Sequence, residues 1–214
     1  MKATKLQLAS ATLLNPGAAQ WKKVPVEDVQ LAGTPLHLQP SRYVRTVWAG
    51  RQVGAVRMVK VQAAHNGKDI FFRLSWRDDT KNDSYGDGSV FPDAAAVVFP
   101  MNGTAPLEND GSPDAPVNLW FWRANKEDAG ENLIARGLAT EEPTKSNGIA
   151  TKSRWEDGSW ELVVSRSIKA SSRETAPIAT AKPNSVGFAV WEGGSQERGS
   201  LHAHSRQWQE LVIE

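Results

Sequence analysis

Two scarce side chains of this sequence, Met101 and His202, are of the types that bind a haem iron. The chain has 214 residues, with three Met, four His and no Cys. A soft thioether and an imidazole together suit the two axial positions of a b-type haem. Met101 follows Phe99 and Pro100, and His202 lies about a hundred residues later, so only the fold can bring the two side chains together. If the fold does so, the pair predicts an electron-transfer site.

His204 is the alternative to His202, because side chains two residues apart share one face of an extended segment. Two such imidazoles also suit a zinc or copper site, which would need a further ligand. No carboxylate at a convincing spacing supplies that ligand. A solvated pair of surface histidines is the ordinary alternative to both sites.

The composition and the missing motifs exclude several functional classes. Without Cys there is no disulfide, no Cys-ligated iron–sulfur cluster and no covalent c-type haem. A net charge of +1 gives no general field for nucleic acid or an anionic membrane. No apolar run is long enough to predict a membrane span. Nucleophile-elbow, dinucleotide-binding and P-loop motifs are absent from the sequence.

Acid–base catalysis is also poorly supported. The carboxylate pairs Asp78-Asp79 and Glu141-Glu142 are sequence neighbours within polar loops. We expect them to be solvated turn residues rather than catalytic partners. The sequence therefore predicts a protein that is not itself an enzyme.

The apolar pattern predicts an all-β protein. Strands are expected at 54–64, 69–76, 93–100, 117–124, 149–155, 159–165 and 185–191, with one or two short strands in 202–213. Asn66-Gly67 and Asp157-Gly158 separate two pairs of strands and predict hairpins with type I′ turns. The best helical candidate is 127–139, although two Gly residues interrupt it. We expect one domain over 1–214, an immunoglobulin-like or jelly-roll-like antiparallel β-sandwich with long loops and a few short helices.

The segment 117–124 places two indoles on one face of a strand. Trp120 and Trp122 alternate with Phe121, and their ordinary role would be core packing. Their functional alternatives are the wall of a haem pocket or a platform for stacking sugars. A carbohydrate-binding module with an exposed Trp platform is therefore the alternative function.

Several segments, in order, resemble one known family. They are VKVQAAHNGKDIFFRLSWRDDTKN (59–82), FPDAAAVVFPM (91–101), VNLWFWRA (117–124), DGSWELVVSRSI (157–168) and VGFAVWEGGSQERGS (186–200). This set resembles the haem b-binding γ subunits of periplasmic molybdenum enzymes of the dimethyl sulfoxide reductase type. Ethylbenzene dehydrogenase, dimethyl sulfide dehydrogenase, selenate reductase and chlorate reductase have such subunits. The resemblance covers most of the chain from about residue 40 onward.

The resemblance implies a β-sandwich with a haem at one edge, held by a Met and a Lys. The family's Met falls on Met101. No Lys occurs after Lys182 in this chain, so the second ligand falls nearest His202, with His204 as the alternative. Neutral imidazole is a good ligand at pH 7, whereas an ammonium group must first lose its proton. Arg198 is the candidate partner of the haem propionates, and Trp120 and Trp122 are candidates for the haem wall.

The resemblance also implies a role and a location. The chain would be a cytochrome b subunit, with non-covalent haem b (iron protoporphyrin IX), relaying electrons between an iron–sulfur subunit and a soluble cytochrome c. Its complex would include a molybdopterin catalytic subunit and lie in the periplasm. Residues 1–17 are too polar for a secretory signal, so the sequence is either that of a cytoplasmic protein or that of a mature chain with an added Met.

Overall fold

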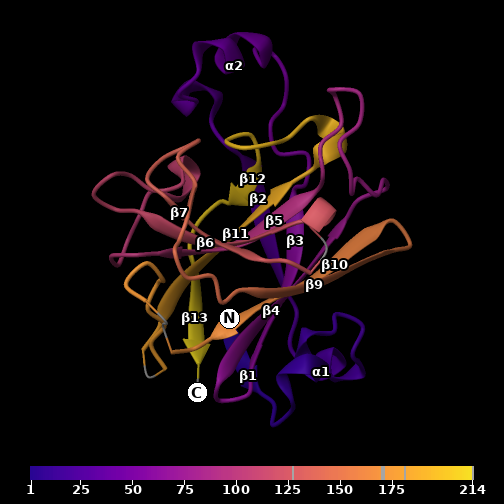
Figure 1. Cartoon of the computed structure of the whole chain (residues 1–214), viewed down its shortest axis with the longest axis vertical. Helices are drawn as coiled ribbons and strands as arrows, with labels where there is room; N and C mark the ends of the chain where they lie inside the picture. Colours follow the sequence, from indigo (N-terminus) through magenta and orange to yellow (C-terminus); the bar gives the residue numbers. More distant parts are fainter. Residues whose placement is uncertain (127, 170–171, 181, 214) are drawn as a thin grey trace.

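The structure, a computed structural model, describes residues 1–126, 128–169, 172–180 and 182–213. The regular structure is dominated by antiparallel strands, which are arranged in two packed layers (Figure 1). The helices are short: α1 is Ser10–Leu14, α2 is Arg42–Val47, and single 3-10 turns lie at Ala19–Lys23 (η1), Leu36–Leu38 (η2), Leu107–Asn109 (η3), Ala124–Lys126 (η4) and Gly193–Ser195 (η5). The predicted all-β sandwich with long loops and a few short helices is confirmed.

Each layer has its own set of strands. The first contains β5 (Ala94–Pro100), β6 (Val117–Arg123), β7 (Glu131–Ala135), β8 (Glu142–Pro143) and β11 (Asn184–Trp191). The second contains β2 (Glu27–Gly33), β3 (Met58–His65), β4 (Asp69–Arg77), β9 (Ala150–Glu156) and β10 (Ser159–Ser167). The short strand β12 (Ala203–Ser205) pairs with β11 and with β2 and so joins the layers. The first and last strands, β1 (Lys2–Lys5) and β13 (Gln209–Ile213), pair in parallel.

Aromatic side chains fill the space between the layers. At one end of the core, the rings of Trp76, Trp122 and Trp160 lie 5.0–6.4 Å apart. Further along, Trp120 packs at 4.6 Å from Phe99. Trp120 and Trp122 are both 0% exposed, because alternation along β6 turns them into the core and turns Leu119 and Phe121 to the outer face. The two indoles are therefore core residues and offer no surface platform.

Both predicted hairpins are present, but only one has the expected turn. Asp157 and Gly158 have positive φ angles of 50° and 69°, as a type I′ turn requires. At the β3–β4 hairpin only Gly67 has a positive φ, of 90°. There the Asn66 side chain accepts hydrogen bonds from the backbone N–H groups of Lys68 and Asp69, at 3.0 and 2.8 Å, and so forms a side-chain turn instead.

The predicted helix at 127–139 is wrong; residue 127 lies outside the described residues. The apolar run that begins at Leu133 pairs with β6 as strand β7. Gly130 lies so close to its neighbours that a Cβ atom there would be 2.6 Å from Ile149. Pairing with β6 outweighs the weak helical pattern, because tertiary contacts override propensity in short segments.

The N-terminal segment covers the outer face of the second layer. Trp21 and Leu13 are buried there against Phe71 of β4 and Val163 of β10. The buried Gln62 side chain donates to the carbonyl oxygens of Trp21 and of Val24, each at 2.7 Å. The segment is thus tied to the sheet by polar as well as apolar contacts. None of the described helices is both long enough and apolar enough to cross a bilayer.

Candidate functional site

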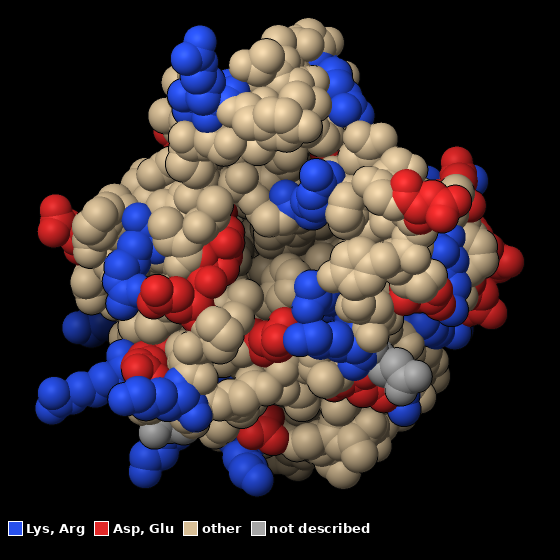
Figure 2. All heavy atoms as spheres, turned by 45° about the horizontal axis from the view of Figure 1, so that its top comes forward, with Lys and Arg blue, Asp and Glu red and all other residues tan. Residues whose placement is uncertain are grey.

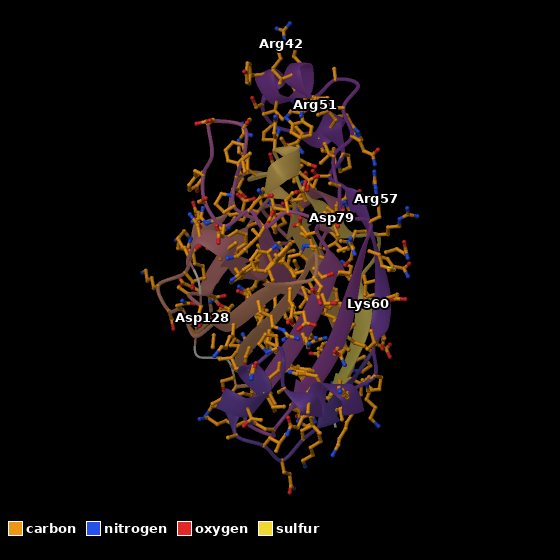
Figure 3. The ribbon with its side chains drawn as sticks, turned by 90° about the vertical axis from the view of Figure 1, so that its right-hand side faces the viewer. Arg42, Arg51, Arg57, Lys60, Asp79 and Asp128 are labelled. Carbon is orange, nitrogen blue, oxygen red and sulfur yellow. The ribbon has the colours of Figure 1, made fainter. Side chains whose placement is uncertain are left out.

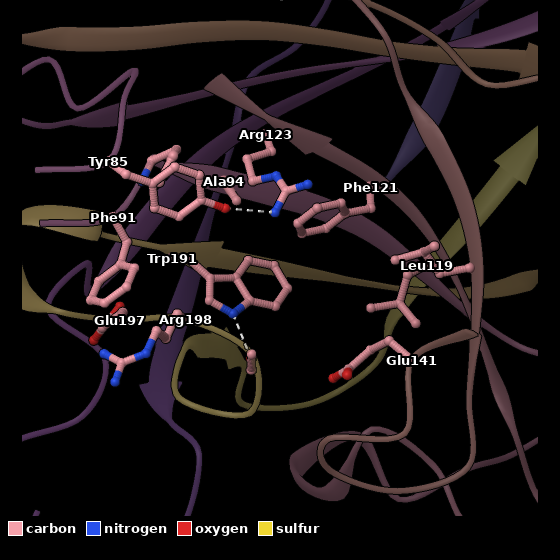
Figure 4. Close-up of a pocket in the computed structure, with 13 residues that line it drawn as sticks. Tyr85, Phe91, Ala94, Leu119, Phe121, Arg123, Glu141, Trp191, Glu197 and Arg198 are labelled. Carbon is pink, nitrogen blue, oxygen red and sulfur yellow. Dashed lines mark hydrogen bonds between the residues drawn. The ribbon is translucent and has the colours of Figure 1, made fainter. Parts of the chain in front are cut away.

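A pocket of about 280 Å³ lies on the outer face of the first layer, at the end where β5 begins and β11 ends (Figure 4). This volume is close to the lower limit of ordinary small-molecule sites, about 300 Å³. The lining residues come from three loops and four strands and are mostly apolar: Tyr85, Phe91, Pro92, Ala94, Leu119, Phe121, Arg123, Leu133, Glu141, Trp191, Glu197, Arg198 and Gly199.

Aromatic rings form the walls of the pocket. Phe121 meets Trp191 edge to face, with ring centroids 5.3 Å apart. The Trp191 indole is held in place because its Nε1 donates to the Gly199 carbonyl oxygen at 2.7 Å. On the opposite side, Tyr85 packs against Phe91 at 6.3 Å. Such walls exclude water and favour a flat, apolar ligand.

Two guanidinium groups reach the pocket from different elements. Arg198 lies over the Phe91 ring, with its Cζ 4.0 Å from the ring centroid. Arg123, at the end of β6, donates through Nη1 to the Tyr85 hydroxyl at 3.2 Å, while its buried Nε has no hydrogen-bond partner in the described part of the chain. Figure 2 shows a hollow in the face turned forward there, bordered by basic and acidic side chains. Two guanidinium groups at one pocket suit a ligand that carries carboxylates.

Two carboxylates also lie at the pocket. Burial raises the pKa of Glu197, although this side chain accepts hydrogen bonds from the backbone N–H groups of Gly54, Ala55 and Glu192, at 2.5, 2.8 and 3.1 Å. Burial likewise raises the pKa of Glu141, whose Oε1 is buried without a partner among the described residues. The prediction that Glu141 is a solvated turn residue is therefore wrong.

His202 lies directly behind the pocket wall. Its ring is 4.4 Å from the Trp191 ring, and its side chain is 0% exposed. Nδ1 lies 3.3 Å from the Gly199 carbonyl oxygen, whereas Nε2 lies 3.4 Å from Asp110 Oδ1 and makes no well-formed hydrogen bond to any described residue. Burial lowers the pKa of the imidazole, but Asp110, the Gly199 carbonyl and Glu141 outweigh burial and raise it. Trp191 separates this imidazole from the pocket.

His204 shares the face of His202, with ring centroids 6.4 Å apart. Its Nδ1 lies 2.8 Å from the Ser205 carbonyl oxygen, and burial lowers its pKa. Within the described ranges, the one group of three metal-binding side chains whose donor atoms lie within 4.8 Å of each other contains neither histidine. Among the described residues, no third ligand therefore joins His202 and His204 to form a zinc or copper site.

Met101 lies at the other end of the first layer. Val190 of β11 pairs on one side with Ala203, the neighbour of His202, and on the other side with Ala95 of β5. Met101 follows Ala95 by six residues in the direction of β5. At about 3.3 Å per residue, this is a separation of roughly 20 Å. Met101 also packs toward the core between the layers and lines a different hollow, beside Pro177 and Asn184. Two ligands of one metal ion, each at about 2 Å, have donor atoms only about 4 Å apart. The structure does not bring Met101 and His202 together.

Of the predicted site residues, Arg198 lines the pocket, and His202 lies behind its Trp191 wall. His204 lies two residues further along the chain, and Trp120 and Trp122 lie in the core. Sequence reasoning missed the rest of the lining, including Phe121, Arg123 and Trp191. Alternation along β6 carried a signal for two of them, because Leu119, Phe121 and Arg123 share the face opposite the indoles. Nothing in the sequence pointed to Trp191.

Comparison with known proteins gives consistent matches. The profile of the family described as ethylbenzene dehydrogenase matches residues 18–151 and 136–203. The chain is 34% identical over 208 residues to the chlorate reductase subunit gamma of Ideonella dechloratans, covering 96% of this chain and 82% of that protein. It is 33% identical to a protein named as a respiratory nitrate reductase heme subunit of Haloferax mediterranei, over 90% of this chain and 66% of that protein.

Two further matches concern a third relative and the fold. The dimethylsulfide dehydrogenase subunit gamma of Rhodovulum sulfidophilum is 26% identical, over 91% of this chain and 73% of its own length. Among solved structures, a family 9 carbohydrate-binding module of Caldicellulosiruptor kristjanssonii in complex with glucose superposes with a TM-score of 0.54 over 100% of this chain and 95% of its own. Its sequence identity is 7%, so it shows the shared sandwich fold alone. The sequence matches show that this chain belongs to the ethylbenzene dehydrogenase family.

Proposed function

We propose that this protein is a haem-binding electron-transfer subunit of a molybdenum oxidoreductase. The observation that carries the proposal is the pocket, which combines aromatic walls, two guanidinium groups and a fully buried imidazole behind Trp191. The names of the relatives support the same role, since two are gamma subunits and one is a heme subunit. The proposed role is electron relay, with no substrate chemistry on this chain.

The pocket chemistry fits haem b held without covalent bonds, because the chain has no Cys to form a thioether. A bound haem would supply a one-electron redox centre. The residues of this chain would exclude water with their aromatic walls and pair Arg123 and Arg198 with the two propionates. We propose His202 as the iron ligand, with His204 as the alternative. Ligation by His202 would require the Trp191 indole to give up its hydrogen bond to the Gly199 carbonyl and Nε2 to leave Asp110.

The predicted six-coordinate haem with Met101 and His202 does not fit this arrangement. The Nε2 of His202 lies 3.4 Å from Asp110 Oδ1, and the separation of roughly 20 Å along β5 supports assigning Met101 and His202 to different sites. We therefore assign Met101 no contact in this pocket. The assignment makes Met101 a discriminating control.

The proposed partners follow from the relatives. We propose a complex with a molybdopterin catalytic subunit and an iron–sulfur subunit, in the periplasm, with a soluble cytochrome c as the exchange partner of the haem. The support is the relation to gamma subunits of chlorate reductase and dimethylsulfide dehydrogenase. The electron path would run from the iron–sulfur subunit to the cytochrome or in reverse, according to whether the complex oxidises or reduces its substrate.

The test is the absorption spectrum of the full chain purified with haem available. We expect a Soret band of bound haem that shifts on reduction. His202→Ala should lose the spectrum of histidine-ligated haem, whereas His204→Ala and Met101→Ala should keep it. Loss only in His204→Ala would move the iron ligand from His202 to His204. Loss in Met101→Ala would overturn the assignment of this pocket, and a colourless protein that takes up no haemin would overturn the proposal.

The carbohydrate-binding alternative loses its predicted platform. It required an exposed indole on β6, but Trp120 and Trp122 are each 0% exposed. Calorimetric titration of the haem-free protein with glucose checks the remaining possibility, in which the pocket itself accepts a sugar. Saturable binding of glucose by a protein that refuses haemin would favour that alternative.

A further inference from the structure

Three carboxylates outside the pocket converge where strands of both layers end. Asp78 follows β4 of the second layer, Asp93 precedes β5 of the first layer, and Glu192 follows β11. Each offers an oxygen atom, and these atoms lie within 4.8 Å of one another. Calcium binds oxygen at about 2.4 Å, so one calcium ion can contact oxygen atoms up to about 4.8 Å apart. Magnesium binds oxygen at about 2.0–2.1 Å and needs a tighter cluster.

Asp78 lacks a partner for one of its oxygens. The residue is 5% exposed, and Oδ1 accepts a hydrogen bond from the Thr80 backbone N–H at 3.1 Å. Oδ2 is buried and has no hydrogen-bond partner in the described part of the chain. Burying a carboxylate oxygen without a hydrogen-bond donor costs free energy. A cation bound beside Oδ2 would offset that cost. The prediction that Asp78 is a solvated turn residue is wrong.

Two neutral side-chain oxygens lie beside the Glu192 carboxylate, which itself accepts from the backbone N–H groups of Gly194 and Ser195. Glu192 Oε1, Asn82 Oδ1 and Thr80 Oγ1 lie 2.8, 2.9 and 3.4 Å from the position that a Cβ atom would take at Gly194. A side chain at residue 194 would therefore fill the space at which these oxygens converge. Carboxylate, amide and hydroxyl oxygens together form a hard donor set, which calcium prefers to softer metals.

The electrostatics of the cluster favour a bound cation. Burial, opposed by hydrogen bonds and aided by the neighbouring carboxylates, raises the pKa of Asp78 to about 6 and the pKa of Asp93 to about 7. Asp78 and Glu192 line an open hollow on the surface, which gives an ion a path from solvent. Asp78 and Asp93 are buried and Glu192 is half-buried, and like charges so close together repel each other unless protons or a metal ion neutralise them.

We propose that Asp78, Asp93 and Glu192 bind one calcium ion, with Thr80 and Asn82 supplying further oxygens. The ion links the second layer to the first, since its ligands flank β4, β5 and β11. It also supports one wall of the pocket. The Gly193 N–H donates to Asp93 Oδ1 at 2.9 Å, and the Gly193 carbonyl accepts from the Phe91 N–H at 3.1 Å.

The test uses the full, haem-free chain after treatment with EDTA, titrated with terbium(III) and then with calcium. The Trp160 Nε1 donates to Asp93 Oδ2 at 2.9 Å, so excitation of tryptophan should sensitise terbium emission at this site. We expect saturation at one equivalent, displacement by calcium and a higher melting temperature with calcium. Absence of saturable emission would overturn the site. Because no haem is present, the outcome is independent of the proposed electron-transfer function.

Matched variants locate the ion. Asp78→Asn and Glu192→Gln should each weaken calcium binding at least tenfold while keeping the far-ultraviolet circular dichroism of the parent. Asp79→Asn is the control, because its exposed carboxylate pairs with Arg77 at 2.6 Å and lies at the surface (Figure 3). Equal weakening by Asp79→Asn and Asp78→Asn would show a diffuse surface effect and overturn the assignment.

Discussion

At the scale of single residues, the pocket is distinguished by polar atoms left without partners. Arg123 Nε and Glu141 Oε1 are buried and lack hydrogen-bond partners in the described ranges. Each such atom costs about 1–3 kcal/mol when it stays unpaired. A ligand with charged groups that contact these atoms would offset part of that cost.

Arg198→Ala tests the propionate contact. A charge-assisted hydrogen bond contributes about 1.5–3 kcal/mol, so we expect the dissociation constant for haem to rise at least about tenfold. Haemin titration followed at the Soret band measures this change. Arg206→Ala, an exposed arginine beyond β12, is the matched control and should leave the constant unchanged. Equal constants for Arg198→Ala and the parent would remove Arg198 from the site.

Glu197 should make the free energy of unfolding decrease as the pH rises. Burial raises the pKa of its carboxyl above the ordinary value of 4.5, so the folded state binds the proton more tightly than the unfolded state. This contribution to stability is fully present below pH 4.5 and is lost as the pH rises through the raised pKa. We expect Glu197→Gln to flatten that part of the profile of unfolding free energy against pH, measured by urea denaturation. A profile as steep as that of the parent would contradict the assignment.

At the scale of elements, the two faces of β6 divide the roles of the strand. Even-numbered Trp120 and Trp122 fill the core, and odd-numbered Leu119, Phe121 and Arg123 face the pocket. Alternation predicted this division from the sequence. The assignment of the haem wall to the indoles failed because periodicity separates two faces without showing which one meets the other layer.

The division predicts unequal effects of neighbouring substitutions. Trp120→Ala should lower the free energy of unfolding by about 3–5 kcal/mol, because it opens a cavity in the core. Phe121→Ala should cost less stability and weaken haem binding, because its ring faces the pocket. Urea denaturation and haemin titration of both variants measure the two effects. The reverse order of stability losses would place the core on the other face.

Predictability also varied among the elements. The hairpins at Gly67 and Gly158 and most strands of the sandwich follow from alternation and turn residues. Strand β7 did not, because its identity depends on pairing with β6 rather than on its own Gly-interrupted pattern. The short helices before β3 carry too few residues to show a helical period.

At the scale of the whole molecule, sheet order decides which distant residues meet. Met101 and His202 were predicted as ligands because Met and His are scarce in this chain and because of the family resemblance. Since β11 lies antiparallel to β5, the two residues lie at opposite ends of the first layer. The same order brings Asp78, Asp93 and Glu192 together, although no local pattern links them. Local sequence rules fix strands and faces; the meeting of strand ends depends on contacts across the whole chain.

The N-terminal cover of the second layer provides a test at this scale. Trp21 is 3% exposed and packs on the sheet as part of the segment before β2. We expect Trp21→Ala to lower the free energy of unfolding by about 3–5 kcal/mol and to expose residues 6–24 to limited proteolysis. Tyr43→Ala, at a residue that is 75% exposed on α2, is the control. Unchanged proteolysis of Trp21→Ala would show that the polar contacts of Gln62 hold the segment alone.

The pairing of β1 with β13 has a kinetic consequence. Lys2 lies beside Val212 and Ala3 beside Ile213, so the sheet joins residues about as far apart in sequence as the described chain allows. Contacts of this kind impose a large loop-closure cost, and β proteins rich in them fold in about milliseconds to seconds. We expect refolding of this chain to be slow, with the contacts between β1 and β13 among the last to form.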